Sequence, residues 1–245
     1  MRTNLLVPLA TATVALFFGM ANTALAAPVG TLNIANCAGG GVTVTATTIT
    51  WLPVGTLPGT GCIDTGAGTS VAYSGGTLLP GVIGNILDLT FSPGSKDMFM
   101  TFPAPPLPAP GLDFVLTSVG PGDANTNCSL VASPGTPQTC SVFAGSPFIL
   151  SFVSPTRTAI SLAVGGTVAD STGTSDWLGV FTTQLDKSAS TIQSDINGGG
   201  SETTTHSASF TLTAVPEPGT VSILGTGLLL VGLAVFRRRS LGARG

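Results

Sequence analysis

Glycine and proline are spread along the whole chain, and this spacing constrains the fold more than any other feature. The 245 residues include 33 glycines and 18 prolines, residue types that interrupt or destabilise helices. Between these breaks lie short runs in which apolar and small or polar residues alternate, at 42–47, 159–164 and 205–212. A period of two is typical of a strand that buries one face. The sequence therefore predicts an all-β protein.

The number of such runs indicates how the strands are arranged. Further short runs that read as strands occur at 86–91, 98–102, 112–119, 148–153 and 178–185. Many short strands separated by turn residues favour an antiparallel sandwich or barrel. We expect one antiparallel β-sandwich, immunoglobulin-like or jelly-roll-like, over residues 27–214.

Two segments of this body depart from the strand pattern. A short helix is expected over 187–197, because Ile192 and Ile196 lie one turn apart and three glycines follow at 198–200. The proline-rich segment 103–110 is expected to run as extended polyproline II on the surface. It would connect the parts of one sandwich, or else separate two smaller β domains.

The amino-terminal segment has the pattern of a secretory signal peptide. An apolar stretch at 5–20 is followed by small residues at Ala24 and Ala26, which is the pattern that signal peptidase accepts. We expect cleavage before Ala27 and removal of residues 1–26. The alternative is an uncut amino-terminal anchor helix.

The cysteine count agrees with export. Four cysteines are present, at Cys37, Cys62, Cys128 and Cys140, and an even number in an exported chain favours disulfides. Three pairings are possible. We favour Cys37 with Cys62 and Cys128 with Cys140, because each pair lies within one half of the chain. A zinc site is disfavoured, since there is no CxxC motif and His206 is remote in sequence.

Charge excludes one large class of partners. Only 8% of the residues are charged, against about 25% in an ordinary soluble domain. The predicted body contains three basic and ten acidic residues, a net charge of about −7. This balance excludes tight binding of the body to nucleic acid or to an anionic membrane.

The carboxyl-terminal end carries the most specific signal. A Pro216-Glu217-Pro218 tripeptide precedes the uncharged apolar stretch 219–236, which as a helix would measure about 27 Å and just span a thin membrane. We expect a transmembrane helix there, followed by a basic tail at 237–245. The positive-inside rule would keep this tail cytoplasmic and the body outside. The tail opens with the expected stop-transfer residues Arg237, Arg238 and Arg239.

This ordered set of tripeptide, apolar stretch and terminal arginines resembles the PEP-CTERM sorting signal of exported bacterial proteins, here over 215–245. The resemblance implies recognition by an exosortase, a membrane-embedded thiol protease-transpeptidase, with cleavage near 216–218. The product would be released, or transferred to the cell surface or an extracellular matrix. More loosely, segments 39–45, 144–148 and 179–184 resemble small PEP-CTERM proteins.

The sequence gives no support for catalysis or metal binding. The lone histidine, His206, lies in a strand pattern and is expected to be packed rather than catalytic. Two aspartate pairs are weak glycosidase candidates, because aromatic residues are only 6% of the chain. These pairs are Asp170 with Asp176 and Asp186 with Asp195. We assign no catalytic residue, no metal and no cofactor.

Two further patterns have structural explanations. The segment 123–127 begins like a calcium loop, but Cys128 replaces the sixth-position glycine and Pro134 the closing glutamate. It is better explained as an asparagine-rich turn. Trp51 and Trp177 would mark a ligand surface only if exposed, and a core or rim position is commoner for tryptophan.

The leading hypothesis is a non-enzymatic protein of the cell surface or extracellular matrix, sorted by an exosortase and linked to exopolysaccharide or biofilm. One alternative is a carbohydrate-binding or polysaccharide-modifying module, and another is a permanently anchored type I envelope protein. We expect an inner-membrane intermediate with its body in the periplasm, followed by a surface or extracellular product. Expected partners are signal peptidase, exosortase, the membrane and possible extracellular polysaccharide, without nucleic acid.

Overall fold

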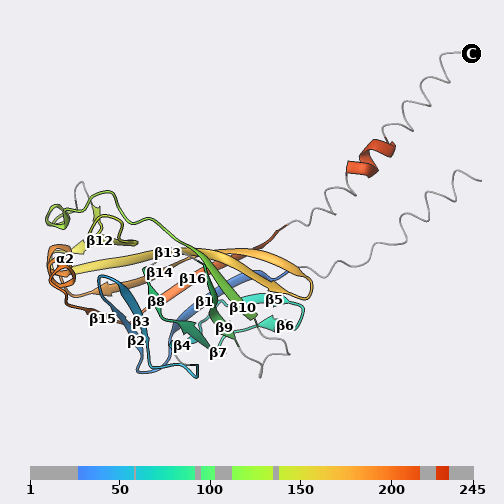
Figure 1. Ribbon diagram of the computed structural model, residues 1–245, viewed down its shortest axis with the longest axis horizontal. Helices are drawn as coiled ribbons and strands as arrows, with labels where there is room; N and C mark the ends of the chain where they lie inside the picture. The colour runs from blue at the N-terminus through green and yellow to red at the C-terminus, as the bar shows by residue number, and fades with distance from the viewer. Residues whose placement is uncertain are drawn as a thin grey trace, which may run out of the picture.

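The computed structural model describes residues 27–57, 59–91, 95–102, 112–134, 138–215 and 225–231 (Figure 1). These residues are mostly β, as the alternating runs predict. In the strand Ser207–Ala214, for example, Ala208, Phe210 and Leu212 are buried while the serines and threonines between them are exposed. Burial of the apolar face removes its side chains from water, and this stabilises the folded strand.

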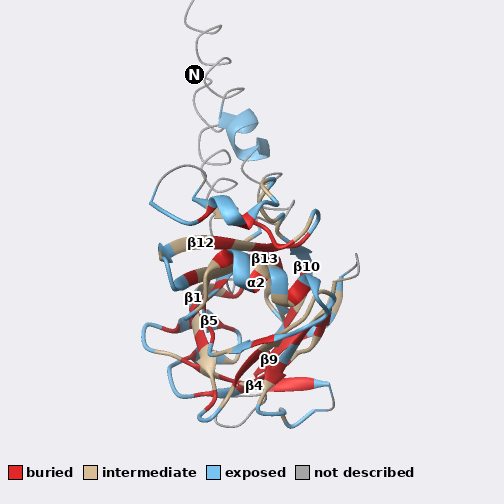
Figure 2. Cartoon of the chain, turned by 90° about the vertical axis from the view of Figure 1, so that its left-hand side faces the viewer, coloured by how far each residue is buried: buried red, intermediate tan, exposed pale blue. Residues whose placement is uncertain are grey.

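Eight antiparallel strands form a closed barrel. Their order around the barrel is β10-β9-β7-β4-β1-β16-β14-β13, and pairing of β13 with β10 closes the ring. Figure 2 shows the strands arranged around a buried interior. The barrel strands are β1 (Val29–Asn36), β4 (Thr60–Thr65), β7 (Ile83–Leu87), β9 (Lys96–Phe102), β10 (Leu112–Val119), β13 (Arg157–Asp170), β14 (Gly173–Leu185) and β16 (Ser207–Ala214).

The predicted β-sandwich is therefore wrong. Sandwiches and barrels both bury alternate residues, so the period of two does not distinguish them. Closure depends on β13, which pairs with β12 (Phe148–Ser154) over its first part and with β10 over its second. Two adjacent glycines in β13, Gly165 and Gly166, lie where the β10 pairing begins. A Cβ on Gly166 would lie 1.8 Å from the carbonyl oxygen of Val115 in β10, so only glycine lets the two strands approach here.

Smaller elements extend the barrel at both ends. The hairpin β5 (Ser70–Tyr73) and β6 (Gly76–Leu78) pairs with the start of β1, and β11 (Thr139–Cys140) pairs with β12. A second sheet has the order β15-β2-β3-β8. Its strands are β15 (Glu202–Thr204), β2 (Gly41–Val44), β3 (Thr48–Leu52) and β8 (Leu89–Thr90).

The two poles of the barrel differ. Strand β1 begins and β16 ends at what we call the closed pole, where β5 and β6 lie. The opposite end, which we call the open pole, carries β12, the second sheet and helix α2 (Ala189–Asn197) (Figure 1). The helix was predicted over 187–197, and its first turn is capped by the Ser188 side chain, which accepts a hydrogen bond from the Thr191 N–H at 3.2 Å.

Aromatic side chains fill the barrel interior. Trp177 is fully buried and lies with its ring centroid 5.6 Å from that of Phe210, 6.0 Å from Phe114 and 6.1 Å from Phe99. Its indole N–H donates to the Thr167 carbonyl at 3.1 Å. The few large rings of this chain are therefore used mainly to fill the core.

The predicted transmembrane helix is not found among the described residues. Within the described ranges no helix is both long enough and apolar enough to cross a membrane. Only 225–231 of the predicted span 219–236 is described, as a short exposed helix. The remainder of the span and the tail 237–245 lie outside the described residues, as does the whole proline-rich segment 103–110.

Candidate functional site

Both ends of the barrel chain meet at the closed pole. Gly30 in β1 lies opposite Leu212 in β16, and the strands run antiparallel. The described fold starts at Ala27, which is buried, and the Val215 N–H just beyond β16 donates to the Thr174 carbonyl at 3.1 Å. The position of the predicted signal cleavage and the start of the predicted sorting signal therefore lie beside the same pair of strands.

The predicted processing residues themselves fall mostly outside the described chain. This is the case for Ala24 and Ala26 before the expected signal cleavage and for the tripeptide 216–218. The stop-transfer arginines at 237–239 also lie outside it. Their assignments remain sequence predictions.

Two disulfides are present, with the pairings favoured from the sequence. Cys37–Cys62 joins residues 25 positions apart, and Cys128–Cys140 joins residues 12 positions apart. The second lies beside α2, because the Cys128 N–H donates to Gln193 Oε1 at 3.2 Å. Each bond constrains the unfolded chain, worth about 3 kcal/mol in the loop-entropy description.

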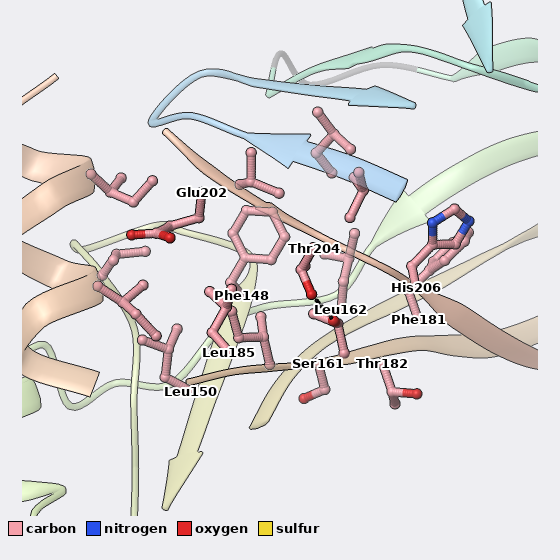
Figure 3. A pocket seen from close by; sticks show the side chains of 18 of the residues that line it. Phe148, Leu150, Ser161, Leu162, Phe181, Thr182, Leu185, Glu202, Thr204 and His206 are labelled. Carbon is pink, nitrogen blue, oxygen red and sulfur yellow. Dashed lines mark hydrogen bonds between the residues drawn. The ribbon is translucent and has the colours of Figure 1, made fainter. Parts of the chain in front are cut away.

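An apolar cavity of about 50 Å³ lies at the open pole, between two layers of strands (Figure 3). One wall comes from the second sheet and the other from β12, β13 and β14, while α2 closes the end. Its lining includes Val42, Val44, Ile49 and Trp51 on the first wall, Phe148, Leu150, Leu162, Phe181 and Leu185 on the second, and Ile192 and Ile196 from the helix.

Two polar side chains, Glu202 and His206, line opposite ends of this cavity (Figure 3). His206 is 5% exposed, and neither of its ring nitrogens has a hydrogen-bond partner among the described residues. Its ring lies edge-on to Trp51, with centroids 4.7 Å apart. Burial in these apolar surroundings lowers the pKa of His206 to about 4, so the imidazole is neutral at pH 7.

Glu202, by contrast, has an ion-pair partner. Lys187 Nζ lies 2.8 Å from a Glu202 carboxylate oxygen and 2.8 Å from one of Asp195 in α2. The two carboxylates raise the pKa of Lys187 to about 12, Asp195 contributing most, and Lys187 lowers the pKa of Asp195. This ion triad ties the helix to β15. Two carboxylates share one cation here, so the triad carries one excess negative charge.

Three of the four aspartates considered for glycosidase chemistry, Asp170, Asp186 and Asp195, are held by other groups, and Asp176 is exposed. Asp170 accepts hydrogen bonds from the Ser74 and Thr172 backbone N–H groups at 2.6 and 2.7 Å. Asp186 pairs with Arg157 at 2.7 Å, whereas Asp195 belongs to the triad. These contacts place Asp170 in a turn and Asp186 and Asp195 in ion pairs.

The calcium-like segment is a turn held to β11. The Asp123 carboxylate accepts from the Asn125 N–H at 2.8 Å and from the Thr139 hydroxyl, and this hydroxyl is the main cause that lowers the pKa of Asp123. Asn125 Oδ1 accepts in turn from the Asn127 N–H at 3.0 Å. Among the residues with a described position, no group of three His, Cys, Asp or Glu side chains is placed to hold a metal ion.

Both tryptophans are buried, Trp51 at 2% and Trp177 at 0% exposure. Trp177 is a core residue, while Trp51 lines the cavity and donates its indole N–H to the Leu87 carbonyl at 3.0 Å.

The sequence did not predict the cavity or the roles of Glu202 and Lys187. One feature of the sequence could have indicated a special role for Glu202, because it is the only acidic residue in a strand-like run made mostly of serine and threonine.

Comparison with protein families identifies one part of the chain. The model of the PEP-CTERM protein-sorting motif matches residues 214–239, so the predicted resemblance of this segment is confirmed. The motif indicates that the chain is an exported protein that an exosortase sorts to the cell surface. No curated protein and no solved structure matches the chain.

Proposed function

We propose that this chain is a non-enzymatic surface or matrix protein, whose β-barrel is the part that remains after processing at both ends. In this proposal signal peptidase cleaves before Ala27, and an exosortase cleaves near 216–218. The observation that carries it is the position of the sorting motif, which begins at residue 214, the last residue of β16. Cleavage just beyond this point would leave every barrel strand intact.

A non-enzymatic role agrees with the placement of the reactive side chains. The single histidine, His206, has no hydroxyl, thiol or carboxylate hydrogen-bonded to its ring in the described chain. A nucleophile–base pair requires that contact. The four cysteines are bonded in disulfides, so none supplies a thiolate.

Burial of both tryptophans weighs against the carbohydrate-binding alternative. Neither Trp51 nor Trp177 offers an exposed ring on which a sugar could stack, because both side chains are buried. A link to exopolysaccharide or biofilm remains part of the proposal and rests on the sorting class alone.

The processing step is tested by replacing Glu217, the one charge of the tripeptide. We expect Glu217→Ala to leave the chain at full length in the cells, because the carboxylate is the feature that would be recognised there. Immunoblots of cells and medium, with Thr220→Ala as the neighbouring control, measure the change. Normal processing of Glu217→Ala with a mature product of unchanged size would contradict the proposal.

A further inference from the structure

A groove of about 760 Å³ is lined by both the second sheet and the barrel wall. The second sheet contributes β8 and the residue after it, Phe91, while the barrel contributes Lys96 of β9 and the end of β10. The loops at 120–124 and 145–147 complete the lining. The volume falls within the range of about 300–1,000 Å³ that is typical of ligand sites.

Both sheets present a strand edge at this groove. Among the described residues, β8 pairs with β3 alone and is the last strand of its sheet. Strand β10 pairs with β9 as far as Leu116, which lies opposite Lys96, whereas its pairing with β13 continues to Val119. The end of β10 therefore has a partner on one side only. An unpaired strand edge is a template on which another extended segment can pair.

The hydrogen bonds next to the β10 edge show which backbone groups face away from the barrel sheet. The Gly120 N–H donates to the Ala163 carbonyl in β13 at 2.7 Å. Backbone groups of successive residues in an antiparallel strand point to opposite sides. The N–H and carbonyl of Val119 therefore point away from β13, and Val119 lines the groove.

The same reasoning applies to the β8 edge. The Phe91 N–H donates to the Thr47 carbonyl at 2.9 Å, so the N–H and carbonyl of Thr90 point away from β3. Thr90 also lines the groove. An extended peptide directs the backbone groups of one residue to one side and those of the next to the other, so a single added strand can pair with both edges.

The groove also contains a cation that has no ion-pair partner among the described residues. The described chain has three basic residues, of which Arg157 and Lys187 pair with carboxylates and Lys96 does not. The one acidic residue of the groove lining, Asp123, is held in the turn beside β11. A carboxylate of a ligand would therefore complement Lys96.

The two strand edges and the cation together define the ligand. We propose that the groove binds an extended peptide segment that carries a carboxylate. The segment lies as an added strand, hydrogen-bonded to Val119 on one side and to Thr90 on the other, with its carboxylate at Lys96. This site does not depend on how the chain is sorted or on the proposed function.

Titration of the exported protein with the acetylated peptide Thr-Val-Thr-Val-Glu, followed by calorimetry, tests the proposal. We expect saturable binding. Two versions of the peptide, each N-methylated at alternate residues to block the N–H groups of one edge, are expected to bind about tenfold more weakly. No saturable binding of the parent peptide, or equal binding of the N-methylated versions, would overturn the proposal.

A saccharide probe distinguishes a peptide site from a site for an acidic sugar chain. Trigalacturonate carries carboxylates and hydroxyl groups but no peptide groups, so it cannot pair with a strand edge. We expect it to bind more weakly than the peptide. Tighter binding of trigalacturonate would overturn the choice of a peptide as the ligand.

The role of the cation is tested by Lys96→Met. We expect about threefold weaker binding of the parent peptide and unchanged binding of an analogue in which amides replace both carboxylates. Arg157→Met removes a positive charge outside the groove and is the matched control with unchanged affinity. Equal effects of the two substitutions would overturn the role of Lys96.

The pairing with β10 is tested by Val119→Pro, which removes the N–H on the groove side and leaves the bonds to β13 in place. We expect about tenfold weaker binding, whereas Val119→Thr keeps the N–H and the branched side chain and should bind normally. Thermal unfolding checks that both variants fold. If the proline variant does not fold, the N-methylated peptides still test pairing at this edge. Equal affinity of two folded variants would overturn it.

Discussion

The two poles of the barrel are built in different ways. At the closed pole, backbone hydrogen bonds run around a complete ring, and aromatic side chains around Trp177 fill the interior. At the open pole, β13 and β14 extend beyond the ring, and the second sheet, α2, an ion triad and Cys128–Cys140 complete the structure. The second arrangement leaves a cavity lined by His206, whose ring nitrogens have no hydrogen-bond partner among the described residues. The closed pole is thus the end at which the sorting motif begins, and the open pole is the end that holds the cavity.

Two tryptophans allow the sharpest test of this difference in packing. Replacing a buried tryptophan with alanine lowers the free energy of unfolding by about 3–5 kcal/mol. We expect the loss for Trp177→Ala to lie near the top of this range, because rigid strands surround the side chain. We expect the loss for Trp51→Ala to lie near the bottom of this range, since the Trp51 side chain already borders a cavity. Free energies of unfolding from denaturant titration measure both. A larger loss for Trp51→Ala would contradict the comparison.

The point where β13 changes neighbours is tested by a glycine substitution. Gly166→Ala places a Cβ against the Val115 carbonyl, and we expect a loss of about 3 kcal/mol from the strain. Gly66→Ala is the control, because its Cβ would meet nothing closer than 3.8 Å. Thermal unfolding measures both variants. Equal melting temperatures for the two would contradict closure of the barrel at this position.

The buried histidine predicts a pH dependence for the open pole. Its pKa is about 4 in the folded chain and about 6.5 when exposed, so the unfolded chain binds the proton more tightly. Stability is fully present above pH 6.5 and falls between pH 6.5 and 4, by on the order of 2 kcal/mol. Unfolding free energies at pH 7 and pH 4.5 measure this loss, and His206→Phe should reduce it. An identical pH dependence in the variant would show that other groups cause it.

The smallest expected effect is local to α2. Lys187→Met removes the cation that both carboxylates share, so the end of the helix should open more readily while the barrel is unaffected. Amide hydrogen exchange, compared between α2 and β16, measures this. Faster exchange in both elements alike would contradict a local role for the triad.

Local features of the sequence predicted local structure well. Alternation located strands such as β16, the spacing of Ile192 and Ile196 indicated α2, and proximity in sequence favoured the two disulfide pairings. The tripeptide and its flanking segments predicted the sorting class. Each of these depends on neighbouring residues, which is why a single sequence carries the information.

Closure and the cavity depend on contacts between distant segments. Pairing of β10 with β13 joins Phe114 to Val168, and alternation within either strand does not specify it. The cavity needs Val44, Phe148 and His206 brought together from three separate parts of the chain. Glu202 reads as an ordinary surface residue until Lys187 and Asp195 are placed beside it.

The mass of the intact exported protein tests the central claim most directly. The account predicts a product that begins at Ala27 and ends within or next to residues 216–218, with both disulfides formed. A secreted or surface product whose mass includes the arginines at 237–239 would contradict processing beside the barrel.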